Sequence, residues 1–382
     1  MASAPFVRLI NLQAQYGFFA TMHWSLAYLF LFREGFSVYE ILAVAGLLYA
    51  AAFVTLAVVR RFRYITALRW GILFRVLAIA PYAWLPDIHA IWVGSVLFGV
   101  GIVYFWVPYN VLYYSHRRPD NKAALSAVSF AVMPFVDVAV TLVAGVIVVA
   151  YGFPALFSLA VLLGVVPLVY TLRLRMPAEP PEPSPDFMGA TDGLRTLMFM
   201  DGIKQGVMWP AVPLVTLFFL TGTFHFAWFF AALGLGGAVG SILIAKVSDK
   251  GKRKLTYLQP FSYFFGVMNV LSAFAGNIFA WGMTRGLATF AHTMYQPFSN
   301  AVYLDKAPSV EALYYTREVL LNAGRTLGVF ILVGFVMVDR LQWALVIPGL
   351  VGLAYPVVVE LKDLYPEERF ILKPFRNVLR QG

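Results

Sequence analysis

The sequence predicts an all-α polytopic membrane protein with twelve transmembrane helices in two pseudo-symmetric six-helix bundles. Three observations lead to this fold class. The 382 residues are 60% hydrophobic and only 13% charged, whereas about a quarter of the residues in a soluble domain are charged. The apolar residues form blocks of about 20, the length that a helix needs to cross a bilayer. The basic residues alternate in density between successive blocks, as they do in polytopic proteins.

Twelve apolar blocks have spanning length. They lie at 9–31, 38–59, 64–85, 88–115, 123–150, 153–172, 195–219, 224–246, 255–275, 277–304, 311–338 and 341–361. The first block follows a short N-terminus without a small-residue cleavage site, so we expect a retained helix rather than a signal peptide. The sequence has no cysteine, which excludes disulfides and thiolate metal sites.

One long interruption divides the chain into two parts. Residues 173–194 are rich in proline and acidic residues, which is typical of an extended linker. We therefore expect a first six-helix bundle at 1–172, a cytoplasmic linker, a second bundle at 195–361 and a cytoplasmic tail at 362–382.

The distribution of basic residues predicts the orientation. If the N-terminus is cytoplasmic, most of the 29 Lys and Arg residues fall on the cytoplasmic side, for example Arg60, Arg61 and Arg63. The opposite side holds Arg33 and Arg340. This bias predicts that both termini lie in the cytoplasm, and we expect the protein in the cytoplasmic (inner) membrane. It also explains the net charge of +10 without a nucleic-acid partner.

The two halves share residues at a nearly constant offset, which indicates two parallel six-helix repeats. The offset is 189 for Trp92 with Trp281 and for Pro108 with Pro297, 188 for Ala124 with Ala312, and 187 for Gly35 with Gly222.

A charged loop follows the predicted helix at 224–246. It reads Ala245-Lys-Val-Ser-Asp249-Lys250-Gly251-Lys252-Arg253-Lys254. With this loop, the twelve helices, the central linker and the two halves, the whole chain resembles the major facilitator superfamily of transporters. The resemblance implies two near-rigid halves, a substrate site between them at mid-membrane, and a gating role for Asp249, Lys250, Lys252 and Arg253. Alternatively, these charges serve only membrane topology.

The predicted helix at 277–304 carries a polar stripe. Arg285, Thr289, His292, Gln296 and Asn300 recur at helical spacing and share one face. The stripe either lines a cavity or joins neighbouring helices by hydrogen bonds. The resemblance favours the cavity, because the first, fourth, seventh and tenth helices line it in that family.

A second stripe follows on the helix at 311–338, with Tyr314, Glu318, Asn322 and Arg325. Glu318 and Arg325 are two turns apart, so we expect no direct pair between them. Arg325 lies 188 positions after Asp137. Opposite charges at these equivalent positions suggest cavity walls of opposite sign, or a pairing that lowers the cost of burial.

The remaining candidates for substrate contact lie on the first, fourth and seventh helices. They are Gln13, Tyr16, His23, Tyr104, Asp201 and Gln205. Lys204 follows Asp201 by three residues and can form an ion pair with it.

Most ionisable residues inside the predicted helices are basic, which favours a small anionic or amphiphilic organic substrate. We expect a monomeric secondary transporter, proton-coupled through Asp137, His292 or Glu318, with export slightly favoured. The sequence has no nucleotide-binding or catalytic motif, so we expect neither a cofactor nor an enzyme. The alternatives are a uniporter, a divalent-metal carrier with His23, His292 and the aspartates as ligands, and a non-transporting receptor or scaffold.

Overall fold

The computed structural model describes residues 4–115, 122–174, 188–248 and 255–365, and these ranges form helices without any β-strand. The first half contains α1 (Ala4–Arg33), α2 (Val38–Val58), α3 (Tyr64–Trp84), α4 (Ile88–Tyr114), α5 (Lys122–Leu163) and α6 (Val165–Leu172). The second contains η1 (Gly189–Leu194), α7 (Arg195–Phe219), α8 (Thr223–Ser248), α9 (Leu255–Ser272), α10 (Ile278–Lys306), α11 (Val310–Met337), η2 (Leu341–Leu345) and α12 (Val346–Leu361). The predicted all-α fold class is therefore confirmed.

Polar side chains begin several of the helices. Ser37 and Glu40 form a reciprocal capping box at the start of α2. Asp87 accepts hydrogen bonds from two backbone amides at the start of α4. Asn277 and Ser309 each accept one, at the starts of α10 and α11. These caps satisfy amides that have no partner within the helix, which is why the apolar blocks begin where they do.

The count of twelve separate spanning helices is not reproduced one for one. Gly152 has a φ of 83°, a conformation that glycine adopts without steric cost, and it divides α5 internally. The predicted helix at 153–172 thus begins inside α5 and ends as the short α6. Seven helices of the described ranges are long and apolar enough to cross a membrane, which makes the chain a multi-pass membrane protein.

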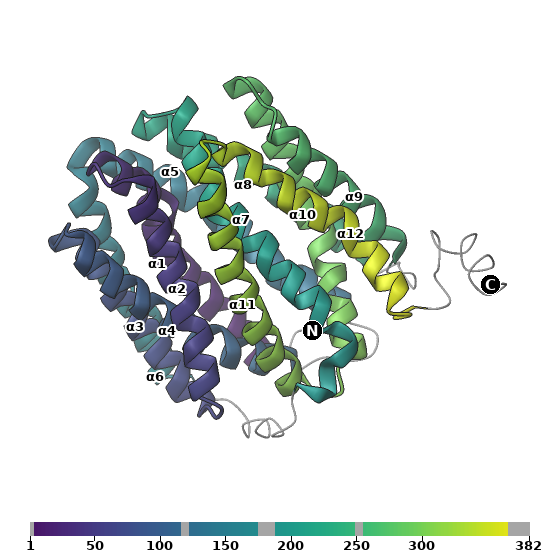
Figure 1. The fold of residues 1–382 in the computed structure, drawn as a ribbon. Coiled ribbons are helices and arrows are strands. Elements are labelled where there is room, and N and C mark those ends of the chain that lie inside the picture. The colour runs from purple at the N-terminus through teal and green to yellow at the C-terminus, as the bar shows by residue number, and fades with distance from the viewer. Residues whose placement is uncertain (1–3, 116–121, 175–187, 249–254, 366–382) are drawn as a thin grey trace.

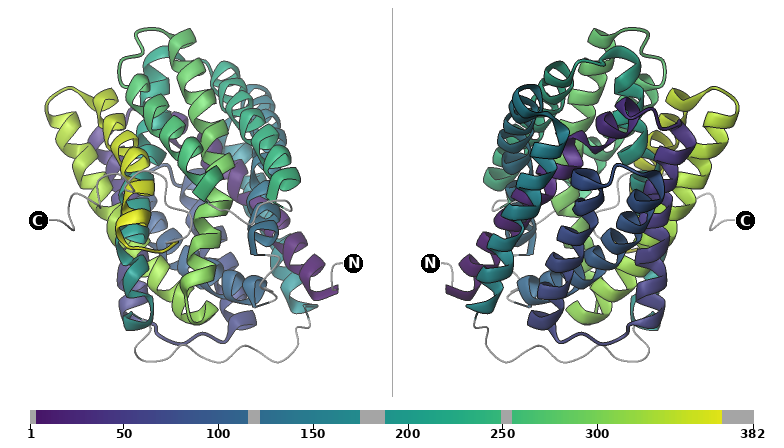
Figure 2. Two further views of the ribbon diagram at one scale, coloured as in Figure 1. Left: turned by 90° about the vertical axis from the view of Figure 1, so that its right-hand side faces the viewer. Right: turned by 90° about the vertical axis from the view of Figure 1, so that its left-hand side faces the viewer.

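Helices from the two halves lie side by side, with α1 to α6 on one side and α7 to α12 on the other (Figure 1). The halves contact each other where α2 packs on α11 and α5 packs on α8. In two six-helix repeats, helices whose numbers differ by six are equivalent, so α2 corresponds to α8 and α5 corresponds to α11. The two contacts are thus related by exchange of the halves, as the predicted repeat requires. Figure 2 shows the bundle from two further sides.

Glycines let α7 and α11 approach closely. A Cβ atom at Gly206 would lie 2.2 Å from the carbonyl oxygen of Arg325, and one at Gly324 would lie 2.4 Å from that of Phe199. Small residues four apart on facing helices allow this backbone contact in membrane proteins. The packing fixes the residues next to Gly206 and Gly324 relative to one another.

Candidate functional site

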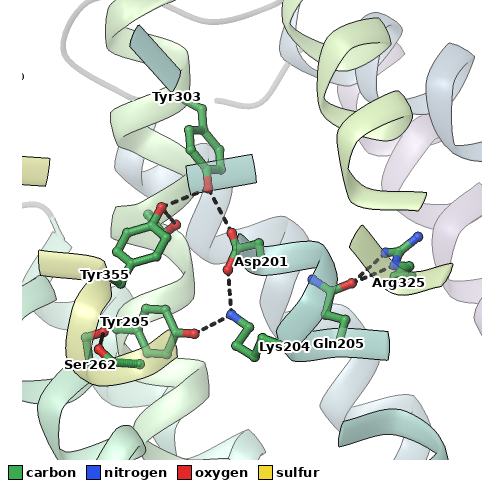
Figure 3. A network of polar contacts seen from close by, with 10 residues as sticks. Asp201, Lys204, Gln205, Ser262, Tyr295, Tyr303, Arg325 and Tyr355 are labelled. Carbon is green, nitrogen blue, oxygen red and sulfur yellow. Dashed lines mark hydrogen bonds and ion pairs between the residues drawn. The ribbon is translucent and has the colours of Figure 1, made fainter. Parts of the chain in front are cut away.

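A charged pair is buried in α7. Lys204 Nζ lies 2.6 Å from Asp201 Oδ1, and the two residues are 0% and 2% exposed. The ion pair predicted from their three-residue spacing is therefore confirmed (Figure 3). Because both charges are removed from water, each depends on the other and on further hydrogen bonds.

Tyrosines from α10 and α12 surround this pair. Tyr303 donates a hydrogen bond of 2.8 Å to Asp201 Oδ2, and Tyr355 donates one of 2.8 Å to the Tyr303 hydroxyl. Lys204 donates to the Tyr295 hydroxyl. We call Asp201, Lys204, Tyr295, Tyr303 and Tyr355 the α7 polar cluster. It connects three helices of the second half, and Figure 3 shows its side chains converging on the pair.

Arg325 of α11 is held beside this cluster. It donates two hydrogen bonds to Gln205 Oε1, over 3.0 and 2.6 Å, and one of 3.0 Å to Asn322 Oδ1. Its Nη1 also lies 3.9 Å from Glu318 Oε2. The expectation that Glu318 and Arg325 form no direct pair is therefore wrong, because the long arginine side chain reaches back along one face of the helix.

Arg325 also contacts the first half. Its guanidinium carbon lies 5.7 Å from the ring centre of Tyr49 in α2 and 4.8 Å from that of Trp209 in α7. Both distances are within the range of a cation–π interaction. Arg325 thus lies at the contact between α2 of the first half and α11 of the second.

The α10 stripe contacts neighbouring helices at two of its positions. Arg285 Nη1 donates a 2.6 Å hydrogen bond to Asn269 Oδ1 of α9. Asn300 Nδ2 donates a 2.9 Å hydrogen bond to Ser126 Oγ of α5. At these positions the stripe joins helices, which was the alternative to lining a cavity.

Two of the other three positions of the stripe leave a polar atom without a partner within the described residues. Thr289 and His292 are half-buried, and Gln296 is buried. His292 Nδ1 and Gln296 Oε1 have no hydrogen-bond partner within the described residues. The His292 ring lies 5.5 Å from Phe265 of α9 and 5.3 Å from Tyr295. This middle segment of α10 therefore borders the α7 polar cluster.

The first half presents a more aromatic surface. Gln13 of α1 accepts a 2.7 Å hydrogen bond from Tyr109 and donates one of 3.0 Å to the Ser129 carbonyl. Tyr16 stacks on Phe105 with ring centres 3.6 Å apart. Tyr104 of α4 instead packs edge-on against Phe62 and Phe74. It therefore lies apart from the candidates Gln13 and Tyr16 of α1.

Asp137 and His23 have different partners, although His23 lies on α1 and Asp137 contacts α1. Asp137 Oδ1 of α5 accepts a 2.7 Å hydrogen bond from Thr21 of α1. His23 Nδ1 lies 3.2 Å from Arg75 Nη2 of α3. The structure thus places Asp137 with a hydroxyl group, not with Arg325, the residue at its equivalent position in the second half.

Contacts between the halves occur at both ends of the bundle. At one end, the Tyr114 and Tyr314 rings stack 5.2 Å apart, next to the hydrogen bond between Ser126 and Asn300. At the other end, Arg33 donates a 2.9 Å hydrogen bond to the Thr221 carbonyl. The two halves are therefore in contact at both of these places.

Several residues of the site were not among the predicted contacts. Arg75 is one of the ionisable residues inside the predicted helices, but it belongs to no stripe or charge pair. Tyr295, Tyr303 and Tyr355 have no such signal, and tyrosine is common at apolar helix surfaces. The predicted gating residues Asp249, Lys250, Lys252 and Arg253 lie outside the described residues. Within those residues, no three His, Cys, Asp or Glu side chains are grouped to hold a metal ion.

No protein-family model matches the chain, and no curated protein matches it by sequence. Solved structures match it strongly by fold. One is the outward conformation of FucP, a major facilitator superfamily transporter, with a TM-score of 0.71 over 94% of this chain and 99% of that one, at 12% identity. FucP is elsewhere described as the E. coli fucose:proton symporter.

Two further structures extend the comparison. The human organic anion transporter TETRAN aligns with a TM-score of 0.69 at 12% identity, over 94% of this chain and all of that one. A POT family transporter bound to a thioalcohol-conjugated peptide aligns with a TM-score of 0.68 at 9% identity, covering 93% and 95% of the two chains. The chain therefore has the architecture of the major facilitator superfamily.

Proposed function

We propose that the protein is a secondary transporter that moves a small anionic or amphiphilic organic solute by alternating access. The observation that carries the proposal is the buried α7 polar cluster of the second half with Arg325 beside it, which reaches Tyr49 of the first half. Ionisable groups inside a membrane are expensive, so they mark solute or ion pathways. The fold supports this reading, since FucP, TETRAN and the POT family protein are transporters of small molecules by name.

Arg285 on the α10 stripe favours an anion. It has an amide as its acceptor and forms no ion pair within the described residues. Uncompensated positive charge in a low-dielectric interior attracts negative solutes. The aromatic side chains of α1 and α4 supply an apolar surface for the rest of the molecule.

Asp137 is the residue that we propose to carry the proton. Asp201 and Glu318 already pair with Lys204 and Arg317, at 2.6 and 2.9 Å. Asp137 has a hydroxyl donor and no cation partner within the described residues. A proton can neutralise it without breaking an ion pair, as a coupling residue requires. His292, with its unpartnered Nδ1, is the second candidate.

Proteoliposomes test the function directly. We would measure uptake of labelled benzoate, an amphiphilic anion, and of choline, a cation, while a trapped pH dye follows protons. The expected result is benzoate flux with accompanying proton movement, and no choline flux. Benzoate flux without proton movement indicates a uniporter. No flux of any anion in a panel, in either gradient direction, contradicts transport and favours a receptor or scaffold.

Asp137→Asn tests the coupling residue in the same assay. We expect it to abolish proton movement and the response of flux to a pH gradient. Asp192→Asn is the matched control, because Asp192 is exposed, lies in η1 and pairs with Arg195, the first residue of α7. Unchanged proton dependence in Asp137→Asn removes this residue from the mechanism.

The placement of the chain belongs to the same proposal. We propose a monomer in the cytoplasmic membrane, with bundles at 1–172 and 195–361, cytoplasmic termini and export as the direction. Since the chain has no cysteine, single cysteines added at Arg340 and in the 249–253 loop report their side of the membrane by labelling. Loading benzoate inside or outside the vesicles tests the direction.

A further inference from the structure

Arg75 of α3 is buried against His23 of α1. Each is 1% exposed. Arg75 Nη2 lies 3.2 Å from His23 Nδ1 and 3.3 Å from the Ala20 carbonyl oxygen. No carboxylate contacts Arg75 among the side chains that the structure describes. This arginine therefore carries a buried positive charge without an ion pair.

The contact fixes the protonation of the histidine. An arginine can only donate hydrogen bonds, so His23 Nδ1 must be the acceptor. The ring proton then sits on Nε2, the imidazole is neutral, and the pair has a charge of +1. In this arrangement Arg75 Nε, Arg75 Nη1 and His23 Nε2 have no hydrogen-bond partner within the described residues.

Aromatic rings surround the pair without supplying acceptors. The guanidinium carbon lies 3.3 Å from the ring centre of Phe98 in α4. The His23 ring lies 4.4 Å from Tyr82 and 5.6 Å from Phe157. A ring stacked on a guanidinium stabilises its charge from above, but the N–H groups in the guanidinium plane still need acceptors. Unmet donors of this kind are costly in a protein interior.

We propose that Arg75 and His23 bind a small monovalent anion inside the first half, such as a halide, nitrate or a short carboxylate. The pair has three nitrogen donors without an acceptor within the described residues and a single positive charge, which one negative charge neutralises. A divalent anion would leave a net negative charge in an apolar, aromatic setting, where burying it is expensive. The site lies within α1, α3 and α4 and does not depend on the proposed transport function.

Other buried arginines are better satisfied. Arg317 pairs with Glu318 at 2.9 Å, and Arg325 has Gln205 and Asn322 as acceptors. Arg285 donates to Asn269, and of its fully buried nitrogen atoms only Nε lacks a partner within the described residues. Arg75 therefore stands apart in the number of donors left without an acceptor.

Thermal unfolding of the purified full-length protein tests the inference. The reference buffer contains gluconate, which is replaced by chloride, bromide, nitrate, formate or sulfate at constant pH and ionic strength. Samples are incubated long enough for anions to reach a buried site. We expect the unfolding midpoint to rise with the small monovalent anions and to saturate with concentration, as binding to the native state requires. Sulfate should have no such effect. Chloride and formate together distinguish an inorganic ion from a carboxylate.

Variants locate the site. Arg75→Met should lose the saturable response, and His23→Phe should weaken the apparent affinity about tenfold, since it removes one donor to a charged ligand. Arg69→Met is the matched control, because Arg69 lies on the same helix and donates to the Thr171 carbonyl over 3.2 Å. It should keep the wild-type response.

Three results overturn the proposal. The first is an equal effect of all anions, which indicates general salt effects with water as the partner of Arg75. The second is an unchanged response in Arg75→Met. The third is a response lost in Arg285→Met and kept in Arg75→Met. If Arg75→Met does not fold, Arg75→Lys and His23→Phe carry the same test.

Discussion

Removing one member of the Asp201–Lys204 pair should destabilise the protein far more than removing both. Lys204→Met leaves Asp201 buried with only the hydroxyl of Tyr303 as a donor, and Asp201→Asn leaves the Lys204 charge against Tyr295. The double variant contains no buried charge at these positions. A buried charge without its partner is penalised by desolvation that nothing offsets.

The burial of the pair sets the magnitude. Both side chains are at most 3% exposed, so solvent screens neither of them. Each single variant should lower the free energy of unfolding by about 3–5 kcal/mol, and the double variant should lie near the wild type. The resulting coupling energy is several kcal/mol, well above the few tenths expected of independent sites.

Equilibrium unfolding in mixed detergent micelles measures the four free energies of the cycle. The control cycle uses Asp192 and Arg195, which have the same three-residue spacing and a 3.2 Å contact but are 82% and 36% exposed. Its coupling should be about 0–1 kcal/mol. Additive losses in the buried cycle, or equal coupling in the two cycles, would refute the reasoning from burial.

Two further changes test the packing and the contact between the halves. Gly206→Ala places a methyl group 2.2 Å from the Arg325 carbonyl oxygen, so we expect a loss of at least about 1–3 kcal/mol in unfolding free energy. Gly334→Ala, with no atom within 4 Å of the added carbon, should be neutral or slightly stabilising; equal effects contradict the close contact of α7 and α11. Cysteines at Ser126 and Asn300, whose side chains now share a 2.9 Å hydrogen bond, should let a short bifunctional thiol reagent stop benzoate flux reversibly. Full flux after complete cross-linking would show that these ends need not separate.

Local sequence patterns were sufficient for the helices themselves. Apolar length places spanning segments because backbone polar groups in lipid must be satisfied within the helix. Ser37 and Asp87 mark helix starts for the same reason. The Asp201–Lys204 pair was also predictable, because it lies within one turn of a single helix. The separation at Gly152 was anticipated as a helix boundary, although the backbone there continues as α5.

Contacts between helices were less accessible to prediction. Periodicity shows which residues share a face, but it does not show which neighbour that face meets. The α10 stripe was expected to border a cavity, yet Arg285 binds Asn269 of α9 and Asn300 binds Ser126 of α5. Glu318 and Arg325 were judged too far apart from their spacing, whereas side-chain length brings them to 3.9 Å.

The sequence by itself determined the membrane class, the two halves and the charged groups inside the bilayer, since these depend on composition, helix length and local spacing. Only the tertiary structure decided how those charges are compensated. It gave Asp201 a lysine and a tyrosine, gave Asp137 a single hydroxyl group, and left Arg75 with a neutral histidine and a phenyl ring. The reason is physical: the energy of a buried charge depends on the groups within a few ångströms of it, and packing brings these together from distant parts of the chain.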